Sequence, residues 1–169
     1  PTRLLFAAPI APAALSVLRV REGSAPAPEA PGRLTQSSIE NEHLRVSFVR
    51  GALRLQDKAT GRVSDGLAVV EDEADRGDAW DFSEPWEPAP TLRSNSFPSS
   101  CRLVESGPVR ASLEVTTRMR VPRSLRGERR SHRTVALTLV MKVSLCRGAR
   151  RVELVVDLDN QARDHRLRI

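Results

Sequence analysis

The stretch that decides the fold is "VRASLEVTTRMRV" at residues 109–121, where two kinds of side chain alternate. Apolar side chains dominate the odd positions, and charged or hydroxyl side chains fill the even ones. A period of two residues is typical of a β-strand with one buried face, because successive side chains point in opposite directions. The stretch "RTVALTLVMKVSL" at residues 133–145 repeats the alternation. We therefore predict two long strands, each with one apolar face.

Strands of this length need a wide covering surface. At about 3.3 Å per residue, such strands reach roughly 40 Å, twice the common length. A third alternating run, "RVELVVDL", follows at residues 151–158 after the short connection "CRGA". Residues 122–132 connect the first long strand to the second. The sequence predicts an antiparallel meander within an all-β sandwich of large sheets.

Shorter elements precede this region. Residues 42–63 are predicted to form two strands, with one turn at Arg50-Gly51 and another at residues 57–61. Residues 22–38 are rich in Pro, Ala and Ser, which predicts a linker. We expect residues 1–21 to be the end of a neighbouring small β module, with one or two strands between 3 and 21. Residues 39–169 are the predicted β-sandwich domain, and we expect it to be a truncated part of a longer protein.

The composition narrows the possible partners. A content of 40% hydrophobic and 28% charged residues is ordinary for a globular domain, and no apolar run is long enough to span a membrane. The net charge of +6 comes almost wholly from arginine, while aromatic residues make up only 4% of the chain. Because bases stack on aromatic side chains, we predict no nucleic-acid partner. Cys101 and Cys146 have no metal-ligand spacing and are predicted to be reduced, structural thiols.

The stretch "EDEADRGDAWDFSEPWE" at residues 71–87 holds eight carboxylates and both tryptophans. Its acids do not follow the order of a calcium-binding loop, and the three histidines lie far apart, so no metal site is predicted. One interpretation is an exposed acidic loop that pairs with residues 118–151, which carry eleven Arg or Lys and one Glu. Another is a sugar-binding loop, because "GDAWDFSEPW" combines an indole with polar acceptors. Both interpretations stay open on composition.

Four blocks together point to a family. They are "IENEHLRVSF", "GALRLQDKATGR", "EDEADRGDAWDFSEP" and "DLDNQARDHRLRI". In order and spacing they resemble glycoside hydrolase family 38 α-mannosidases, most closely the bacterial branch that includes mannosylglycerate hydrolase. The resemblance covers residues 39–169.

The resemblance implies a fold and an activity. The blocks belong to the β-rich C-terminal half of these enzymes, which has the galactose mutarotase-like supersandwich fold. The family implies a retaining, zinc-dependent exo-mannosidase that acts on α-mannosides. Its nucleophile, acid/base and zinc ligands lie in an N-terminal barrel of the same polypeptide, and none of those motifs occurs here. We therefore expect no catalytic residue and no zinc ligand in this chain, no activity of the chain alone, and a cytoplasmic bacterial location.

The resemblance also suggests site residues. The family's loop matching "RGDAWDFSEP" approaches the catalytic domain, and Trp80 stands where a tyrosine is common. Trp80 would keep the stacking face and lose the phenol hydroxyl. Asp78 and Asp81 would either accept hydrogen bonds from sugar hydroxyls or brace the loop.

A second candidate group is Asp164, His165 and Arg166 in "RDHRLR". These residues would lie near the cleft or a domain interface, or form a structural ion-pair cluster in which Asp164 orients His165 or Arg166. We favour the structural role. The alternative function, from a different class, is a stand-alone carbohydrate-binding β-sandwich without hydrolase activity.

Overall fold

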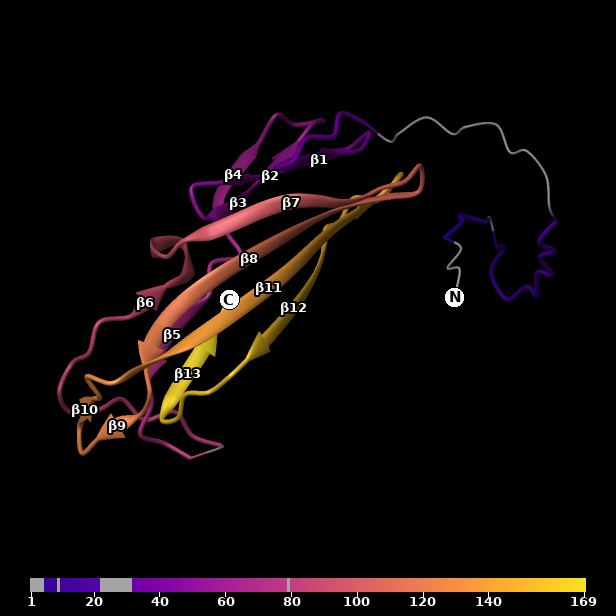
Figure 1. The fold of residues 1–169 in the computed structure, drawn as a ribbon. Helices are drawn as coiled ribbons and strands as arrows, with labels where there is room; N and C mark the ends of the chain where they lie inside the picture. The colour runs from indigo at the N-terminus through magenta and orange to yellow at the C-terminus, as the bar shows by residue number, and fades with distance from the viewer. Residues whose placement is uncertain (1–4, 9, 22–31, 79) are drawn as a thin grey trace.

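The computed structural model describes residues 5–8, 10–21, 32–78 and 80–169 (Figure 1). Within these ranges, every regular element except one short 3-10 turn, Ser94–Ser96, is a β-strand. All the strand pairs are antiparallel, which confirms the all-β prediction. No helix in the described part of the chain has the length and apolar character needed to cross a membrane.

The largest sheet is a meander with the strand order β12-β11-β8-β7. Its strands are β7 (Ser99–Ser106), β8 (Arg110–Pro122), β11 (Thr134–Cys146) and β12 (Glu153–Asp159). β8 and β11 pair over their entire length of 13 residues each. The two predicted long strands are therefore confirmed, each displaced by one residue. A small hairpin of β9 (Leu125–Arg126) and β10 (Arg129–Arg130) interrupts the connection between them.

Two smaller sheets accompany the large one. The first has the order β1-β2-β3-β4, with β1 Ser38–Glu40, β2 Leu44–Val49, β3 Ala52–Asp57 and β4 Val63–Leu67. The second has the order β13-β5-β6, with β5 Glu71–Ala74, β6 Leu92–Arg93 and β13 His165–Arg168. The predicted turn at Arg50-Gly51 is confirmed: both residues have positive φ, 50° and 78°, as a tight two-residue hairpin turn requires.

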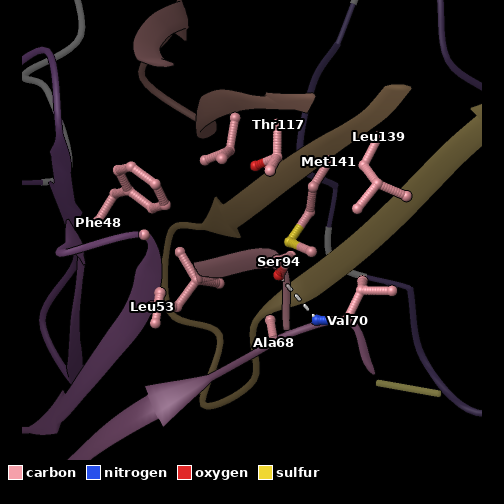
Figure 2. Close-up of a pocket in the computed structure, with 11 residues that line it drawn as sticks. Phe48, Leu53, Ala68, Val70, Ser94, Thr117, Leu139 and Met141 are labelled. Atoms are coloured by element: carbon pink, nitrogen blue, oxygen red, sulfur yellow. Dashed lines mark hydrogen bonds between the residues drawn. The ribbon is translucent and has the colours of Figure 1, made fainter. Parts of the chain in front are cut away.

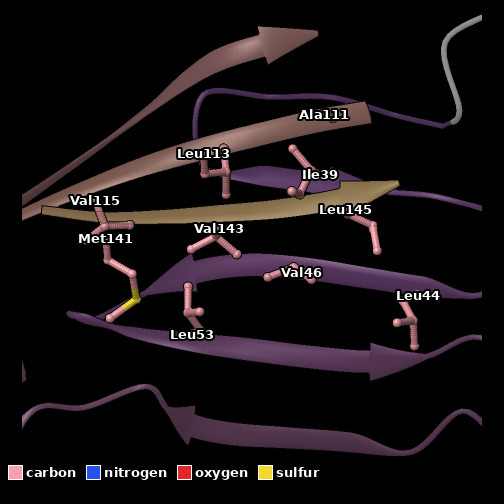
Figure 3. Close-up of a cluster of buried hydrophobic side chains, with 10 residues drawn as sticks. All are labelled: Ile39, Leu44, Val46, Leu53, Ala111, Leu113, Val115, Met141, Val143 and Leu145. Carbon is pink, nitrogen blue, oxygen red and sulfur yellow. The ribbon is translucent and has the colours of Figure 1, made fainter. Parts of the chain in front are cut away.

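Two hydrophobic cores bury the inner face of the large sheet. The first lies between the large sheet and β1–β4 (Figure 3). It consists of Ile39, Leu44, Val46, Leu53, Ala111, Leu113, Val115, Met141, Val143 and Leu145. The second consists of Val70, Met119, Val121, Leu137, Leu139 and Ala162, with Leu92 and Leu167 packed against it. The wide surface that the long strands need is thus supplied by two small sheets, each of which covers part of the stripe.

A cavity of about 20 Å³ lies where the two cores approach one another (Figure 2). Phe48 and Leu53 line one part, and Val70 and Leu139 line another. The Val70 N–H donates to Ser94 Oγ at 2.9 Å. A space of this size holds one water molecule and no substrate.

Asn41 joins the first small sheet to the large one. Its side-chain amide donates to the carbonyl oxygens of Cys146 and Ala149, each at 2.8 Å. Its Oδ1 accepts from the N–H groups of His43 and Leu44, at 2.9 and 2.8 Å. The side chain is fully buried, and every hydrogen-bonding position of the amide is used. The turn after β11 is therefore fastened to the chain between β1 and β2.

The structure differs from the sequence predictions before residue 22, at the end of the predicted linker and in β12. Residues 5–8 and 10–21 contain no strand, so the one or two strands expected between 3 and 21 are not found among them. The last residue of the predicted linker (residues 22–38) belongs to a strand, because β1 begins at Ser38. Residues 22–31 lie outside the described residues. Leu154 and Leu158 of β12, predicted to share an apolar face, remain 43% and 44% exposed because β12 is an edge strand. Cys101 and Cys146 are both free, as predicted.

The two cores predict how leucine truncation will act. Leu113→Ala empties a fully buried position of the first core and should lower the free energy of unfolding by about 2–5 kcal/mol. Leu154→Ala, at a partly exposed position of the edge strand β12, is the matched control and should change it far less. Urea denaturation of the 169-residue chain measures both; equal losses would contradict the burial described here.

Candidate functional site

The acidic stretch begins as a strand rather than a loop. Residues Glu71–Ala74 form β5, the middle strand of the second small sheet. Alternation buries Asp72 and Ala74 and leaves Glu71 and Glu73 half-buried at the surface. This stretch therefore has three kinds of carboxylate: Asp72 in the interior, Glu71 and Glu73 on the surface of the sheet, and those of the loop that follows.

Asp72 is the centre of a buried charge cluster. Its Oδ1 lies 2.5 Å from His165 Nδ1, and its Oδ2 forms an ion pair with Arg130. The exposed fraction of the Asp72 side chain is 0%. A buried carboxylate is costly unless it is paired and hydrogen-bonded, and both oxygens of Asp72 meet this condition.

The second ring nitrogen of His165 also has a hydrogen-bond partner. Its Nε2 lies 3.0 Å from Asn160 Oδ1, which also accepts the Ala162 N–H at 3.0 Å. Because Ala162 identifies that atom as the amide oxygen, both ring nitrogens of His165 face acceptors. The two contacts fix the orientation of the His165 ring between Asp72 and Asn160.

A second set of ion pairs holds β13 on β5. Arg166 donates to Glu73 at 2.7 Å, and Arg168 reaches Glu71 at 3.1 Å and Glu73 at 2.5 Å. The Arg166 guanidinium also lies over the Phe82 ring, 3.4 Å from its centre. Hydrogen bonding from Arg166, together with Arg168, lowers the pKa of Glu73.

Asp164 has a different role from the one predicted. His165 and Arg166 take their carboxylates from Asp72 and Glu73, and Asp164 orients neither. Its Oδ2 accepts the Leu125 N–H at 2.9 Å, and its carbonyl accepts the Asp75 N–H at 3.0 Å. The prediction relied on proximity in sequence, but Asp164 precedes β13 in a left-handed conformation, and the pairing of β13 with β5 brings Asp72 and Glu73 to His165 and Arg166 instead.

The loop after β5 is closed by its own hydrogen bonds. Asp75 Oδ1 accepts the N–H groups of Gly77 and Ser83, at 2.8 and 3.0 Å, and Arg76 N donates to Ser83 O at 2.9 Å. A Cβ at Gly77 would lie 1.7 Å from the Asp81 carbonyl oxygen, so only glycine fits there. This ring of contacts defines the aromatic loop, residues 75–84.

The three predicted substrate-binding residues lie together on the aromatic loop. Asp78 Oδ1 accepts the backbone N–H groups of Trp80 and Asp81 at 2.8 and 3.0 Å, which lowers the pKa of Asp78. Asp78 therefore braces the loop through one oxygen. Trp80 is 91% exposed, and the Asp81 carboxylate has no hydrogen-bond donor among the described residues.

Some of the acids pair with the arginine-rich segment, as one interpretation expected. Arg129 pairs with Glu87 at 2.5 Å, and Arg130 pairs with Asp72. Trp86, 78% exposed, lies 5.2 Å from the Arg76 guanidinium. Ion pairs and exposed indoles thus occur in the same stretch. The paired acids, Asp72 and Glu87, lie near its two ends, and both tryptophans lie between them in sequence.

Sequence reasoning did not single out Asp72, Glu73, Arg130 or Asn160. The signal available for Asp72 was its alternation with Glu71 and Glu73, which places it on the opposite face of a strand. Within the described ranges, no three His, Cys, Asp or Glu side chains converge as a metal site would need. The residues present therefore do not fit the zinc ion that the family implies.

Comparisons with known proteins agree with this fold. The model of the family described as "Glycosyl hydrolases family 38 C-terminal domain" matches residues 39–169. The chain belongs to this family, glycosyl hydrolase family 38, and represents part of its C-terminal domain. Its all-β fold of antiparallel sheets is similar to that of solved family 38 structures.

Particular relatives can be named. The chain is 27% identical over 154 residues to a Halalkalibacterium halodurans protein named "Putative mannosylglycerate hydrolase", covering 81% of this chain and 17% of that protein. An α-mannosidase from Enterococcus faecalis V583 has a TM-score of 0.75 and 22% identity, covering 82% of this chain and 18% of the other. A family 38 protein from E. faecalis also gives 0.75, with 23% identity, covering 88% and 19%. The chain thus spans about a sixth of the curated relative's length.

Removing the charge of Asp72 should destabilise the chain. Asp72→Asn keeps the shape but leaves the buried guanidinium of Arg130 without its counter-charge, so we expect a loss of about 3–5 kcal/mol in the free energy of unfolding. The matched control is Asp65→Asn, which breaks the exposed pair with Arg54 and should have little effect. Urea denaturation at pH 7 compares them. A loss no larger than that of the control would contradict the central role of Asp72.

Glu73 should contribute acid-sensitive stability. Its pKa is lowered in the folded chain, so its contribution is present above its ordinary value of about 4.5 and is lost as the pH falls through the folded value. Glu73→Gln should therefore lower the urea midpoint at pH 7, and the gap from wild type should shrink towards pH 3. Glu84→Gln is the control, because Glu84 forms no ion pair among the described residues. A gap that stays constant with pH would contradict this assignment.

Proposed function

We propose that this chain is the non-catalytic β-sandwich portion of a retaining, zinc-dependent α-mannosidase. It packs on the catalytic barrel of the same polypeptide and contributes the aromatic loop to the substrate cleft. Family membership supports a glycosidase, and the short span of the relatives that the chain covers supports a role as one part of a larger enzyme. The same membership favours this function over a stand-alone carbohydrate-binding module.

The observation that carries the proposal is the form of the aromatic loop. Its backbone is tied by Asp75 and Asp78, while the Trp80 indole remains in solvent. Sugar rings present C–H groups to indole faces, and their hydroxyls donate to carboxylates. Trp80 would stack on the substrate, and Asp81 would accept from its hydroxyls. A preformed loop loses little conformational entropy when it binds.

The catalytic steps are assigned outside this chain. We place the nucleophile, the acid/base and the zinc ligands in the catalytic barrel, and the chain alone is proposed to be inactive. The substrate is proposed to be an α-mannoside, and the name of the H. halodurans relative points to mannosylglycerate as a candidate. A cytoplasmic bacterial location stays a prediction.

An apolar groove supports the packing role. It measures about 520 Å³ and lies between the first small sheet and β12. Leu55 and Leu67 line one side, and Val152, Leu154 and Ile169 line the other. Open apolar surface of this kind is typical of a surface that another part of a protein covers.

Trp80→Ala tests the proposed role of the loop. In the complete polypeptide that carries this chain, loss of the stacking face should lower kcat/KM for a chromogenic α-mannoside by about tenfold. Trp86→Ala is the matched control, because that indole lies against Arg76 and should affect turnover less. Both variants should have the same urea midpoint of unfolding as the wild type. Wild-type turnover in Trp80→Ala, or hydrolysis by the 169-residue chain alone, would overturn the proposal.

A further inference from the structure

One edge of the large sheet is open along β12. This strand is the outermost of its sheet and pairs with β11 on one side (Figure 1). Within the described ranges, no strand pairs with its other side, so every second backbone N–H of Glu153–Asp159 points away from the sheet. A row of unpaired N–H and C=O groups is a ready template for one more strand.

The side chains of β12 are those of an interior strand rather than an edge strand. Leu154 lies opposite Val143 of the first core, so Leu154 and Leu158 share the inner face and Val155 lies on the outer face. These three side chains remain 43%, 44% and 57% exposed. Apolar residues on both faces are typical of a strand that is covered on both sides.

The usual protections of an edge strand are absent from β12. Lysine, proline and bulges commonly blunt such edges, but "ELVVDLD" has neither residue, and its seven pairs with β11 run without a shift in register. The opposite edge of the sheet, β7, differs. Its pairing with β8 shifts between Leu103 and Glu105, and Gln36 Oε1 accepts the Leu103 N–H at 3.3 Å. The unprotected edge is therefore the one formed by β12.

This edge borders the apolar groove of about 520 Å³. Val152 and Leu154 line the groove on one side, and Gly66 of β4 lines it on the other. β4 is also an edge strand, but its pairing with β3 is irregular and Gly66 has a φ of 70°, which makes it a poor template. A strand added to β12 would lie about 4.8 Å from it and direct every second side chain into the groove.

The carboxylates of β12 define the charge of the missing neighbour. Asp157 and Asp159 lie on the outer face, and within the described ranges neither forms an ion pair. The residues directly opposite them on β11 are uncharged: Val140 and Thr138. The nearby Lys142 is directed to Glu105, at 3.7 Å. A cation directly opposite either aspartate can therefore come only from the unpaired side of β12.

A second copy of the chain would not supply that cation. If β12 paired with itself in antiparallel fashion over its whole length, Glu153 would stand opposite Asp159 at both ends and Asp157 opposite Val155. Like charges in directly opposite positions destabilise a strand pair. The charge pattern therefore disfavours a homodimer through this edge.

We propose that a β-strand from another part of the complete polypeptide pairs with β12 and fills the apolar groove. Its inward positions carry apolar side chains that pack against Leu154, and its outward positions carry Arg or Lys opposite Asp157 and Asp159. Backbone hydrogen bonds hold such an added strand, and its alternate side chains make the fit specific. The inference rests on the proposed function, because it requires the chain to be one portion of a larger polypeptide.

Residue-resolved hydrogen exchange of the complete polypeptide tests the pairing. We expect every amide of Glu153–Asp159 to be protected, because the outward N–H groups donate to the added strand. In the 169-residue chain alone, every second amide of β12 should exchange at least about tenfold faster. Rapid exchange of these alternate amides in the complete polypeptide would overturn the inference.

Two substitutions in the complete polypeptide locate the contact. Leu154→Asp places a carboxylate in the groove, and Asp157→Lys reverses an exposed charge, so each should speed exchange of the outward amides. Val104→Asp is the matched control, because Val104 is similarly exposed on β7, the other edge strand of the sheet. Wild-type protection in both β12 variants, or equal loss of protection in the control, would contradict the proposed contact.

The oligomeric state of the 169-residue chain distinguishes the two possible occupants. A monomer by light scattering, with the outward amides of β12 in fast exchange, supports a strand from elsewhere in the polypeptide. A dimer whose formation protects the same amides as the concentration rises would overturn the proposal in favour of a second copy.

Failure of this inference can be told from failure of the proposed function. Hydrolysis of a chromogenic α-mannoside by the complete polypeptide tests the glycosidase activity without using β12. Hydrolysis with unprotected β12 amides would overturn the added strand alone. Protected β12 amides without hydrolysis would support the added strand and overturn the α-mannosidase assignment.

Discussion

The structure depends on burying the apolar face that β8 and β11 share. The two strands pair from Thr134 opposite Pro122 to Cys146 opposite Arg110, so their inward side chains form one continuous stripe. A stripe of roughly 40 Å is longer than the strands of an ordinary small sheet. Two sheets therefore share it: β1–β4 cover one part and β13-β5-β6 covers the other. Asn41 fastens the first of them at the turn that follows β11.

This division also determines where the charged groups lie. β5 is the middle strand of the second small sheet, so one of its faces is turned to the interior. Asp72 lies on that face, paired with Arg130 and hydrogen-bonded to His165, because an unpaired buried carboxylate would be strongly destabilising. The cluster joins β5, the β9–β10 hairpin and the start of β13 at the end of the molecule opposite β1–β4 (Figure 1). The aromatic loop begins at this junction.

Much of the fold was predictable because the large sheet has one solvent-exposed face and one buried face. Alternation placed both long strands within one residue of their observed bounds, and Arg50-Gly51 identified the hairpin turn. Partners of charged side chains were not predictable in the same way. Asp164 is adjacent to His165 in sequence, yet the carboxylate that holds His165 is 93 positions away. Strand pairing between β13 and β5 creates that contact, and no local pattern encodes it.

By itself, the sequence determined the strand character, the position of the tight turn, the family of the chain and the segment that displays Trp80. Each of these follows from local periodicity, from backbone preferences or from motifs read in order. Only the tertiary structure decided that two sheets share the long stripe, that Asp72 is the interior carboxylate, and that the open edge of β12 borders an apolar groove. The reason is that burial and ion pairing are properties of surfaces brought together from distant parts of the chain, and distance along the chain says nothing about which surfaces meet.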